Sequence, residues 1–205
     1  MIKIGVLISG SGTNLQAIID NINEGKIKGK IEVVISNRKD AYGLKRAKKM
    51  GIETLYVNRK EFNSLEEYNR KILDELYKRK IELVVLAGFL NILSQEFIEE
   101  YRGRIINIHP SLIPSFCGKG CYGDNVHKMV LDRGVKLTGV TVHFVDEGTD
   151  TGPIILQRAV EVREQDTVET LKERVLKVEH ELLPEAIRLY CEGRLVIKGS
   201  TVRIK

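Results

Sequence analysis

The sequence contains no tryptophan, and aromatic residues make up only 6% of its 205 residues. Proteins that bind single-stranded nucleic acid stack bases on such rings, so this composition argues against a nucleic-acid partner. The three cysteines are an odd number and do not make a disulfide framework. Because the chain enters a strand-like segment without a secretory signal, we expect these thiols to stay reduced in a cytoplasmic protein.

Long hydrophobic runs are also missing. The longest, Leu83 to Leu90, is far shorter than the ~20 apolar residues that cross a bilayer, so no membrane partner is expected. Hydrophobic residues still make up 42% of the chain and charged residues 30%, which is the balance of a folded globular protein. The length suits one domain, and we expect residues 1–205 to form it.

The charges are mixed along the chain. A net charge of +5 results from 33 basic and 28 acidic residues. The two signs are interleaved in helix-like stretches such as 71–80 and 172–177, which is typical of solvated helix faces and not of a nucleic-acid surface. A mildly positive field would also suit small anionic substrates.

Apolar runs alternate with amphipathic stretches through the first half of the sequence. Strands are expected at 2–8, 31–35, 52–57, 83–87 and 104–108, and helices at 14–23, at 40–50, after Ser64 and after Ser94. Ser64 and Glu67 have the spacing of a capping box. Parallel strands joined by helical crossovers are the expected product. The predicted fold is therefore α/β, a Rossmann-like doubly wound and mostly parallel sheet with helices on both faces.

The second half has a different pattern. A long loop from 109 to 123 precedes a helix that ends near Arg133, and two longer strands at 137–145 and 154–162 flank the loop 146–153. A long helix is expected from Asp166, capped with the help of Glu169, and it ends near Gly193. A short hairpin-like pair of strands closes the sequence.

A glycine-rich segment, Ser9-Gly10-Ser11-Gly12-Thr13-Asn14, lies where the first strand ends and the first helix begins. Free amides and the positive end of a helix attract phosphate there, and Asn14 is expected to cap the helix. A dinucleotide site is the alternative. However, Leu15 occupies the third glycine position of that fingerprint, and no acidic residue ends the second strand. Because Arg38 could meet the extra phosphate of NADP, an NADP site stays an alternative, and a plain strand-to-helix turn is another.

Asn107 and His109 alternate with apolar residues at the end of the strand at 104–108. Their side chains should project to one face at the carboxyl edge of the sheet, where open α/β sheets bind ligands. A lone histidine is more often structural, but Asn107 and the proline-stiffened loop beyond it favour a functional site.

The acidic loop 146–153 could fold over the same edge, so that one carboxylate pairs with His109, and His143 on the preceding strand could support it. Acidic loops are often simply solvated. Cys117, Cys121 and His127 suggest a metal site only weakly, because a fourth ligand is missing. We expect no metal.

Four segments occur in one chain in a characteristic order: Gly10 to Gln16, Leu86 to Leu90, Asn107 to Leu112 and Asp146 to Pro153. With these motifs the sequence resembles the phosphoribosylglycinamide formyltransferases, folate-dependent enzymes of purine synthesis, from Ile4 to about Leu195. The resemblance implies transfer of a formyl group from 10-formyltetrahydrofolate to the amine of glycinamide ribonucleotide. It implies no metal, and a monomer or homodimer.

The resemblance also implies residue roles. The catalytic residues would be Asn107, His109 and Asp150. The ribonucleotide would be bound by Gly12, Thr13, Asn14, Pro110 and Glu179. The folate would be bound by Leu65, Leu90, Asn91, Ile92, Leu93 and Asn107, assisted by the backbone at 146–150.

The implied chemistry agrees with these side chains. Attack of an amine on a formyl carbon gives a tetrahedral intermediate with a developing oxyanion, which Asn107 and protonated His109 would stabilise. His109 could then protonate the departing nitrogen, and Asp150 would keep the ring charged and oriented.

Some positions depart from the common family pattern. Cys117 stands where proline is frequent, and the stretch beyond it is several residues longer than in many relatives. Leu65 stands where some relatives have a basic residue near the folate tail. Methionyl-tRNA formyltransferase and formyltetrahydrofolate deformylase share the Asn-x-His-Pro centre but carry additional domains. A non-enzymatic nucleotide or folate sensor is the alternative from another class.

Overall fold

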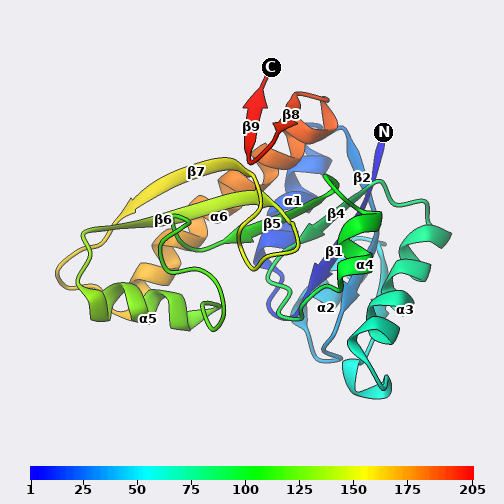
Figure 1. Ribbon diagram of the computed structural model, residues 1–205, viewed down its shortest axis with the longest axis horizontal. Helices are drawn as coiled ribbons and strands as arrows, with labels where there is room; N and C mark the ends of the chain where they lie inside the picture. Colours follow the sequence, from blue (N-terminus) through cyan, green and yellow to red (C-terminus); the bar gives the residue numbers. More distant parts are fainter. The chain divides into compact units, whose positions relative to one another are not determined.

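The computed structural model describes all 205 residues, and the chain groups into two compact units, Met1–Ile106 and Asn107–Lys205. Each unit has its own strands and helices (Figure 1). Strand β5 (Ile105–His109) begins in the first unit and ends in the second. The single domain expected over residues 1–205 stays a prediction.

The first unit has the alternation of strands and helices that the sequence predicts. Its elements are β1 (Ile2–Ile8), α1 (Thr13–Asn23), β2 (Gly29–Ser36), α2 (Tyr42–Lys49), β3 (Glu53–Tyr56), the 3₁₀ helix η1 (Arg59–Glu61), α3 (Leu65–Lys78), β4 (Leu83–Leu86) and α4 (Gln95–Glu100). The strands lie in the order β3-β2-β1-β4. β1 pairs in parallel with β2 and with β4, and β2 pairs in parallel with β3, which confirms the predicted parallel sheet.

Helices cover both faces of this sheet, as expected. A Cβ added to Gly5 would lie 2.8 Å from Leu76 of α3, whereas a Cβ on Gly43 of α2 would lie 2.4 Å from the Ile8 side chain. Gly5 and Ile8 are an odd number of positions apart on β1, so they face opposite sides of the sheet. Because α3 packs on one side of β1 and α2 packs on the other, the sheet is doubly wound.

The second unit is built on β6 (Leu137–Phe144) and β7 (Ile154–Glu161), which pair antiparallel. β9 (Thr201–Ile204) continues the sheet parallel to β7, and β8 (Leu195–Lys198) pairs antiparallel with β9. The long helix α6 (Val168–Cys191) packs on β6 and β7, and α5 (Asp124–Arg133) packs on α6 (Figure 1). The predicted terminal hairpin is thus present.

Helix capping differs from the sequence-based expectation at α6. The N-cap is Thr167, whose side chain accepts from Thr170 N–H in a capping box, so the expected partnership of Asp166 with Glu169 is wrong. Asp166 instead binds Arg174 through paired contacts of 2.7 Å. Because this pair is charge-assisted and bidentate, it competes successfully for the carboxylate. The Arg174 guanidinium holds the pKa of Asp166 well below its ordinary value.

The capping box at α3 is formed with a shift of one residue. Ser64 Oγ accepts from Glu67 N–H at 3.1 Å, as predicted. The Glu67 carboxylate, however, accepts from the N–H of Asn63 at 3.0 Å and not from that of Ser64. Side chains therefore accept from two backbone N–H groups around the start of the helix, one before the N-cap residue and one in the first turn.

The expected cap at α1 is wrong as well. Gly12, and not Asn14, is the N-cap residue, with a left-handed φ of 69° and no side-chain cap. A Cβ on Gly12 would lie 2.5 Å from the Cα of Gly43 on α2. Two glycines are therefore needed for α1 and α2 to approach each other. Asn14 lies inside the first turn of α1.

Spanning a bilayer takes a helix of ~20 mostly apolar residues, and none of the helices described above meets this requirement.

This close approach predicts a large effect of Gly43→Ala on stability. Overpacking costs ~1–3 kcal/mol, and the better helix propensity of alanine offsets up to ~1 kcal/mol. We expect the free energy of unfolding, measured with urea, to fall by roughly 1–2 kcal/mol. Gly10→Ala is the matched control, because no atom lies within 4 Å of an added Cβ, and its effect should stay within ~0.5 kcal/mol. Equal effects of the two substitutions would contradict this packing argument.

Candidate active site

The polar side chains at the end of β5 lie at the start of the second unit. Asn107 is half-buried, and His109 is 4% exposed. A strand alternates its side chains, so the two residues project to the same face, as the sequence predicts. The elements that follow β5 supply their partners.

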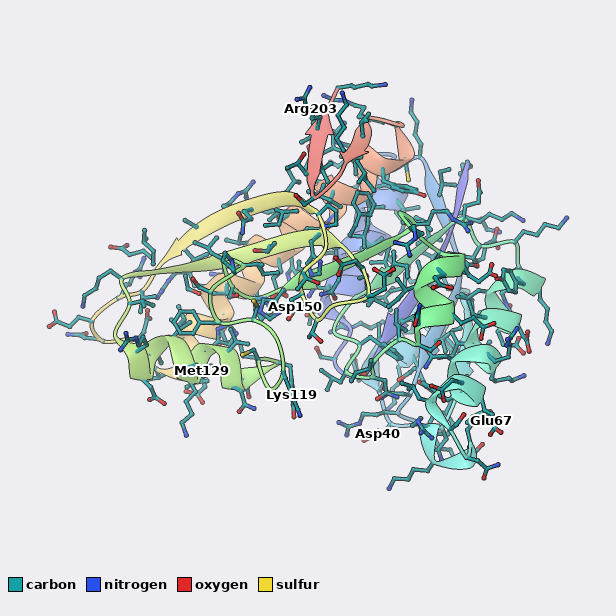
Figure 2. All side chains as sticks on the ribbon, in the orientation of Figure 1. Asp40, Glu67, Lys119, Met129, Asp150 and Arg203 are labelled. Carbon is teal, nitrogen blue, oxygen red and sulfur yellow. The ribbon has the colours of Figure 1, made fainter.

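Asp150 lies close to His109. It sits in the loop between β6 and β7 (Figure 2), and its Oδ2 is 3.7 Å from Nδ1 of His109. The distance is that of an ion pair and is longer than a hydrogen bond. The same carboxylate oxygen accepts from the N–H of Gly118 at 2.9 Å. Asp150 has a left-handed φ of 59°, a strained conformation that clusters at functional sites.

The second nitrogen of His109 faces the backbone. Nε2 donates to the carbonyl oxygen of Phe116 at 2.9 Å, because a carbonyl can only accept. Phe116 also has a positive φ, 51°. The ring is thus held between a backbone carbonyl on one side and a carboxylate on the other. Sequence reasoning missed Phe116, since a backbone acceptor leaves no signal in the residue type.

His143 joins the cluster from β6. Its Nε2 is 3.1 Å from Nδ2 of Asn107 and 3.7 Å from Oδ1 of Asp150. Its Nδ1 is 2.8 Å from the carbonyl oxygen of Phe144. The ring is 2% exposed. Burial lowers the pKa of His143 below its ordinary value, although Asp150 and the Phe144 carbonyl oppose this shift.

An irregularity of the β6–β7 pair lies at this histidine. Val142 is opposite Leu156, but His143 is opposite Ile154, so β7 carries one extra residue. Bulges of this kind re-aim side chains next to active sites. The loop then returns so closely that a Cβ on Gly152 would lie 1.9 Å from the carbonyl oxygen of Phe144. Only glycine fits there, and this contact fixes the loop that carries Asp150.

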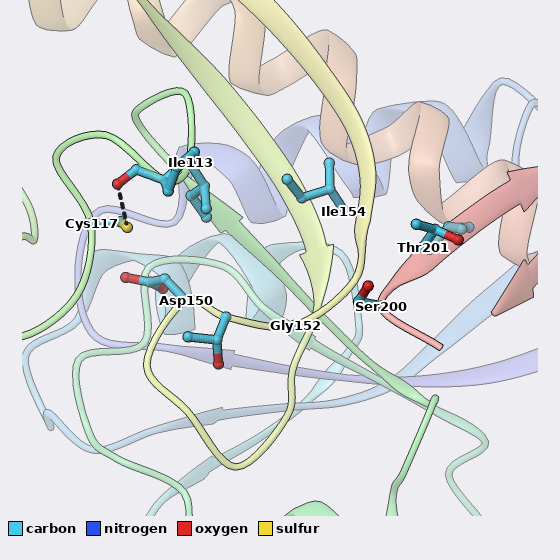
Figure 3. A pocket seen from close by; sticks show the side chains of 10 residues that line it. Ile113, Cys117, Asp150, Gly152, Ile154, Ser200 and Thr201 are labelled. Atoms are coloured by element: carbon cyan, nitrogen blue, oxygen red, sulfur yellow. Dashed lines mark hydrogen bonds between the residues drawn. The ribbon is translucent and has the colours of Figure 1, made fainter. Parts of the chain in front are cut away.

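A cavity of about 490 Å³ lies beside Asp150. Its walls come from the segment after β5, from the 150–154 segment and from the turn between β8 and β9, and Cys117 and Asp150 line it together (Figure 3). Cys117 is held by a 3.3 Å contact of Sγ with the Pro114 carbonyl. Burial, together with Asp150 and Cys121, raises the pKa of the Cys117 thiol, so this cysteine is a poor nucleophile at neutral pH.

Cys117, Cys121 and His127 do not form a ligand set. Cys121 Sγ contacts Met129 Sδ at 3.8 Å, and His127 is buried on α5, where burial lowers its pKa. No group of three or more histidine, cysteine, aspartate or glutamate side chains is arranged to hold a metal ion.

The predicted ribonucleotide residues are divided between the two units. In the second, Pro110 directly follows β5, and Glu179 is 7% exposed on α6. In the first, Gly12, Thr13 and Asn14 form the start of α1 after the loop.

The glycine loop of the first unit has a basic neighbour that sequence reasoning missed. Nε of Arg46 on α2 donates to the carbonyl oxygen of Ser11 at 3.0 Å, and its guanidinium stacks 5.0 Å from the ring centroid of Tyr42. No carboxylate pairs with Arg46. Leu15, at the third fingerprint position, is fully buried.

The segment after β4 is tied to the end of β1. Ser9 N–H donates to the Gly88 carbonyl at 3.1 Å, and Ser9 Oγ accepts from Leu90 N–H at 2.9 Å. The side chains of Leu90 and Ile92 are 54% and 71% exposed, whereas Leu93 is buried. An apolar surface therefore lies next to the glycine loop within this unit, at the carboxyl ends of β1 and β4.

Two asparagines support this segment. Asn69 donates to the carbonyl oxygens of Leu65 at 2.9 Å and Ile92 at 3.4 Å, which brings together two residues of the predicted folate set. Asn37 Nδ2 donates to Asn91 Oδ1 at 2.8 Å. The other amide atoms, Asn37 Oδ1 and Asn91 Nδ2, are buried without a hydrogen-bond partner. An unmatched acceptor and donor thus lie beside the apolar surface.

Comparisons with known proteins identify the family of this chain. Residues 2–187 match the family described as formyl transferase. The phosphoribosylglycinamide formyltransferase of Haemophilus influenzae is 42% identical over 200 residues, which are 98% of this chain and 92% of that protein. The crystal structure of glycinamide ribonucleotide transformylase 1 from Symbiobacterium toebii superimposes with a TM-score of 0.95 at 50% identity, covering 100% of this chain and 94% of that one.

A longer relative matches as well. The trifunctional purine biosynthetic protein adenosine-3 of Gallus gallus is 44% identical over 196 residues, 96% of this chain but 19% of that protein. The chain therefore spans about a fifth of the length of that relative. Since the family match runs through both compact units and includes β5, the 146–153 loop and the glycine loop, this chain belongs to the formyl transferase family.

Proposed function

We propose that the chain is a phosphoribosylglycinamide formyltransferase of purine biosynthesis. It would transfer a formyl group from 10-formyltetrahydrofolate to the amine of glycinamide ribonucleotide. The observation that carries the proposal is the group of Asn107, His109 and Asp150 at the end of β5, with His109 Nδ1 and Asp150 Oδ2 3.7 Å apart. A binding protein needs a pocket but not a carboxylate, an imidazole and an amide gathered in this way.

The proposed chemistry develops negative charge on the formyl oxygen. When the amine attacks the formyl carbon, donors aimed at that oxygen lower the barrier most. Asn107 supplies an amide N–H, and His109 in its protonated form carries hydrogens on both ring nitrogens. The Asp150 carboxylate then balances the charge on the ring and holds its orientation. The proposal gives no metal a role.

His109 would also deliver a proton. The donor nitrogen must gain a proton before it leaves, and an imidazolium in the cluster is the general acid for that step. Because Nε2 faces the Phe116 carbonyl and Nδ1 faces Asp150, one ring N–H has to leave its protein acceptor to reach the substrate. The bond between the formyl carbon and the donor nitrogen then breaks, and the proton that the attacking amine gives up restores the imidazolium beside Asp150.

The ribonucleotide phosphate is assigned to Gly12, Thr13 and Asn14 in this proposal. The amides at the start of α1 and the positive end of the helix favour an anion. The uncompensated charge of Arg46, fixed to the loop through the Ser11 carbonyl, adds to the field. Pro110 and Glu179 are proposed to contact the ribose and glycinamide parts.

The folate is assigned to Leu65, Leu90, Asn91, Ile92, Leu93 and Asn107. The exposed faces of Leu90 and Ile92 suit a flat ring. The amides of Asn37 and Asn91, which bind each other beside this surface, are proposed to supply polar groups for the edge of that ring. Leu65 offers no charge, so the glutamate end would be held differently from relatives with a basic residue there.

The cytoplasm is the proposed compartment, which fits three free thiols. A monomer or homodimer is proposed for the assembly. Formyltetrahydrofolate deformylase activity would release formate without the acceptor, and a sensor would bind without turnover. A spectroscopic formyl-transfer assay, run with and without glycinamide ribonucleotide, separates these functions from the proposed one.

His109→Asn should leave the binding of both substrates within a few-fold while kcat falls by ~10²–10⁴-fold, because the imidazolium acts mainly in the transition state. Calorimetry and steady-state kinetics measure the two effects separately. His180→Asn, at a half-buried histidine of α6, is the control and should keep kcat. Near-normal turnover of His109→Asn would refute the assignment.

The glycine loop is expected to prefer a phosphate monoester to a dinucleotide. Calorimetry should show glycinamide ribonucleotide binding at least ~10-fold more tightly than its dephosphorylated nucleoside, since charge-assisted hydrogen bonds contribute ~1.5–3 kcal/mol. NADPH should not compete. Substitution of Gly12 is a poor test, because any side chain there meets Gly43 whether or not phosphate binds. Tight NADPH binding that displaces the ribonucleotide would contradict the proposal.

A further inference from the structure

The hydrogen bonds of His143 determine where its proton lies. The carbonyl oxygen of Phe144 can only accept, and it lies 2.8 Å from Nδ1, so Nδ1 carries a hydrogen. In the neutral ring Nε2 then has a free lone pair and can only accept. Its neighbour at 3.1 Å, Asn107 Nδ2, is a donor. The contacts on both sides of the ring are therefore satisfied by a single neutral tautomer.

The same contact orients the amide of Asn107. If Oδ1 faced His143, Nε2 would need a hydrogen and the ring would be an imidazolium. A ring that is 2% exposed is strongly disfavoured in its charged form. The amide nitrogen therefore faces His143. It has two hydrogens, so one binds His143 and the other remains for a ligand of the half-buried Asn107.

The surrounding charges do not reverse this choice. Asp150 and Asp146 of the 146–153 loop favour a charged ring, whereas burial, the largest effect, and His109 of β5 oppose it. The pKa of His143 is therefore lowered, and the neutral ring predominates at neutral pH. Asp150 Oδ1 at 3.7 Å is beyond hydrogen-bond distance from Nε2, so it does not replace Asn107 as the partner.

The backbone also holds the ring in place. The extra residue on β7 opposite His143 interrupts the regular register, and Gly152 packs on the same Phe144 carbonyl that accepts the Nδ1 hydrogen. The acceptor of His143 thus cannot move without moving the loop that carries Asp150.

We propose that His143 is a positioning residue, which in its neutral Nδ1–H form accepts a hydrogen bond from Asn107 and directs the second amide hydrogen of Asn107 to the reacting formyl oxygen. The inference rests on the proposed function, in which Asn107 stabilises that oxygen. His143 itself does not touch the substrate. Protonation of His143 would place a hydrogen on Nε2 opposite the amide hydrogen of Asn107 and would break the contact, so activity should fall as the pH drops through its lowered pKa.

The tautomer can be tested without turnover. In ¹⁵N-histidine-labelled protein at neutral pH, NMR should show His143 with a protonated Nδ1 and an unprotonated Nε2, assigned by the loss of its signals in His143→Gln. A proton on Nε2, or an imidazolium, would overturn the inference whatever the enzyme does.

Kinetics test the effect on Asn107. His143→Phe removes the acceptor and should lower kcat by about 10- to 100-fold with KM for both substrates within a few-fold. His143→Gln places a carbonyl oxygen near the position of Nε2, and we expect it to recover most of kcat. It should also remove the part of the acid limb of the pH profile that arises from His143. Thermal unfolding shows whether His143→Phe still folds. If it does not, the kcat of His143→Gln and the NMR tautomer test the positioning role instead.

A double-mutant cycle separates this role from a structural one. If His143 acts through Asn107, His143→Phe should cost less than about twofold in an Asn107→Ala background. A multiplicative loss would overturn the positioning role while leaving the proposed function intact. If Asn107→Ala alone kept wild-type kcat, the proposed role of Asn107 would fail and this inference with it. Absence of formyl transfer by the wild-type enzyme would refute the proposed function, and the tautomer would remain an independent result.

Discussion

A single carboxylate placed between two imidazole rings is the constraint on which the second unit depends. Asp150 is 13% exposed and lies 3.7 Å from both His109 and His143. A buried charge is costly unless donors and opposite charge surround it. The Gly118 amide supplies one donor, and the left-handed backbone at Asp150 directs the side chain inward. The negative charge of Asp150 is thus surrounded by the 146–153 loop, the bulge between β6 and β7, and the end of β5.

The two rings flank that charge with different hydrogen bonds. His109 donates from Nε2 to a backbone carbonyl and turns Nδ1 to the carboxylate. His143 uses Nδ1 for a carbonyl and turns Nε2 to an amide donor. One ring is placed to carry a proton in the reaction, and the other to stay neutral. Two residues of the same type thus acquire separate roles through the atoms that they face.

Much of the fold could be predicted from the sequence because it depends on local periodicity. The alternation of apolar runs and amphipathic stretches located the strands and helices, and the parallel order of the first unit followed from crossover connections. Asn107 and His109 were found because two polar side chains in alternate positions at a strand end are unusual. The acidic loop suggested that a carboxylate lies near them, but the sequence could not predict the distance between Asp150 and His109.

What the sequence could not predict depends on contacts between distant atoms. The Phe116 and Phe144 carbonyls act through the backbone, which every residue type shares. The register shift at His143 has no periodic signal, and the approach of Gly12 to Gly43 is visible only when α1 and α2 are packed. Asn14 was expected as a cap because its residue type is favourable there. The Gly12 contact with α2 decided the helix start instead.

The burial of Leu15 bears on how this fold could change its ligand. In a dinucleotide fingerprint the third glycine lets the helix pack closely on the strand, but here a fully buried leucine fills that space. Removing a core leucine side chain lowers the free energy of unfolding by roughly 2–5 kcal/mol. The whole free energy of unfolding of a native protein is only ~5–15 kcal/mol. Conversion to a dinucleotide-binding loop by one substitution would therefore weaken the fold before any new ligand could bind. The packing of Leu15 beneath α1 therefore restricts which ligands the glycine loop could come to bind by single substitutions.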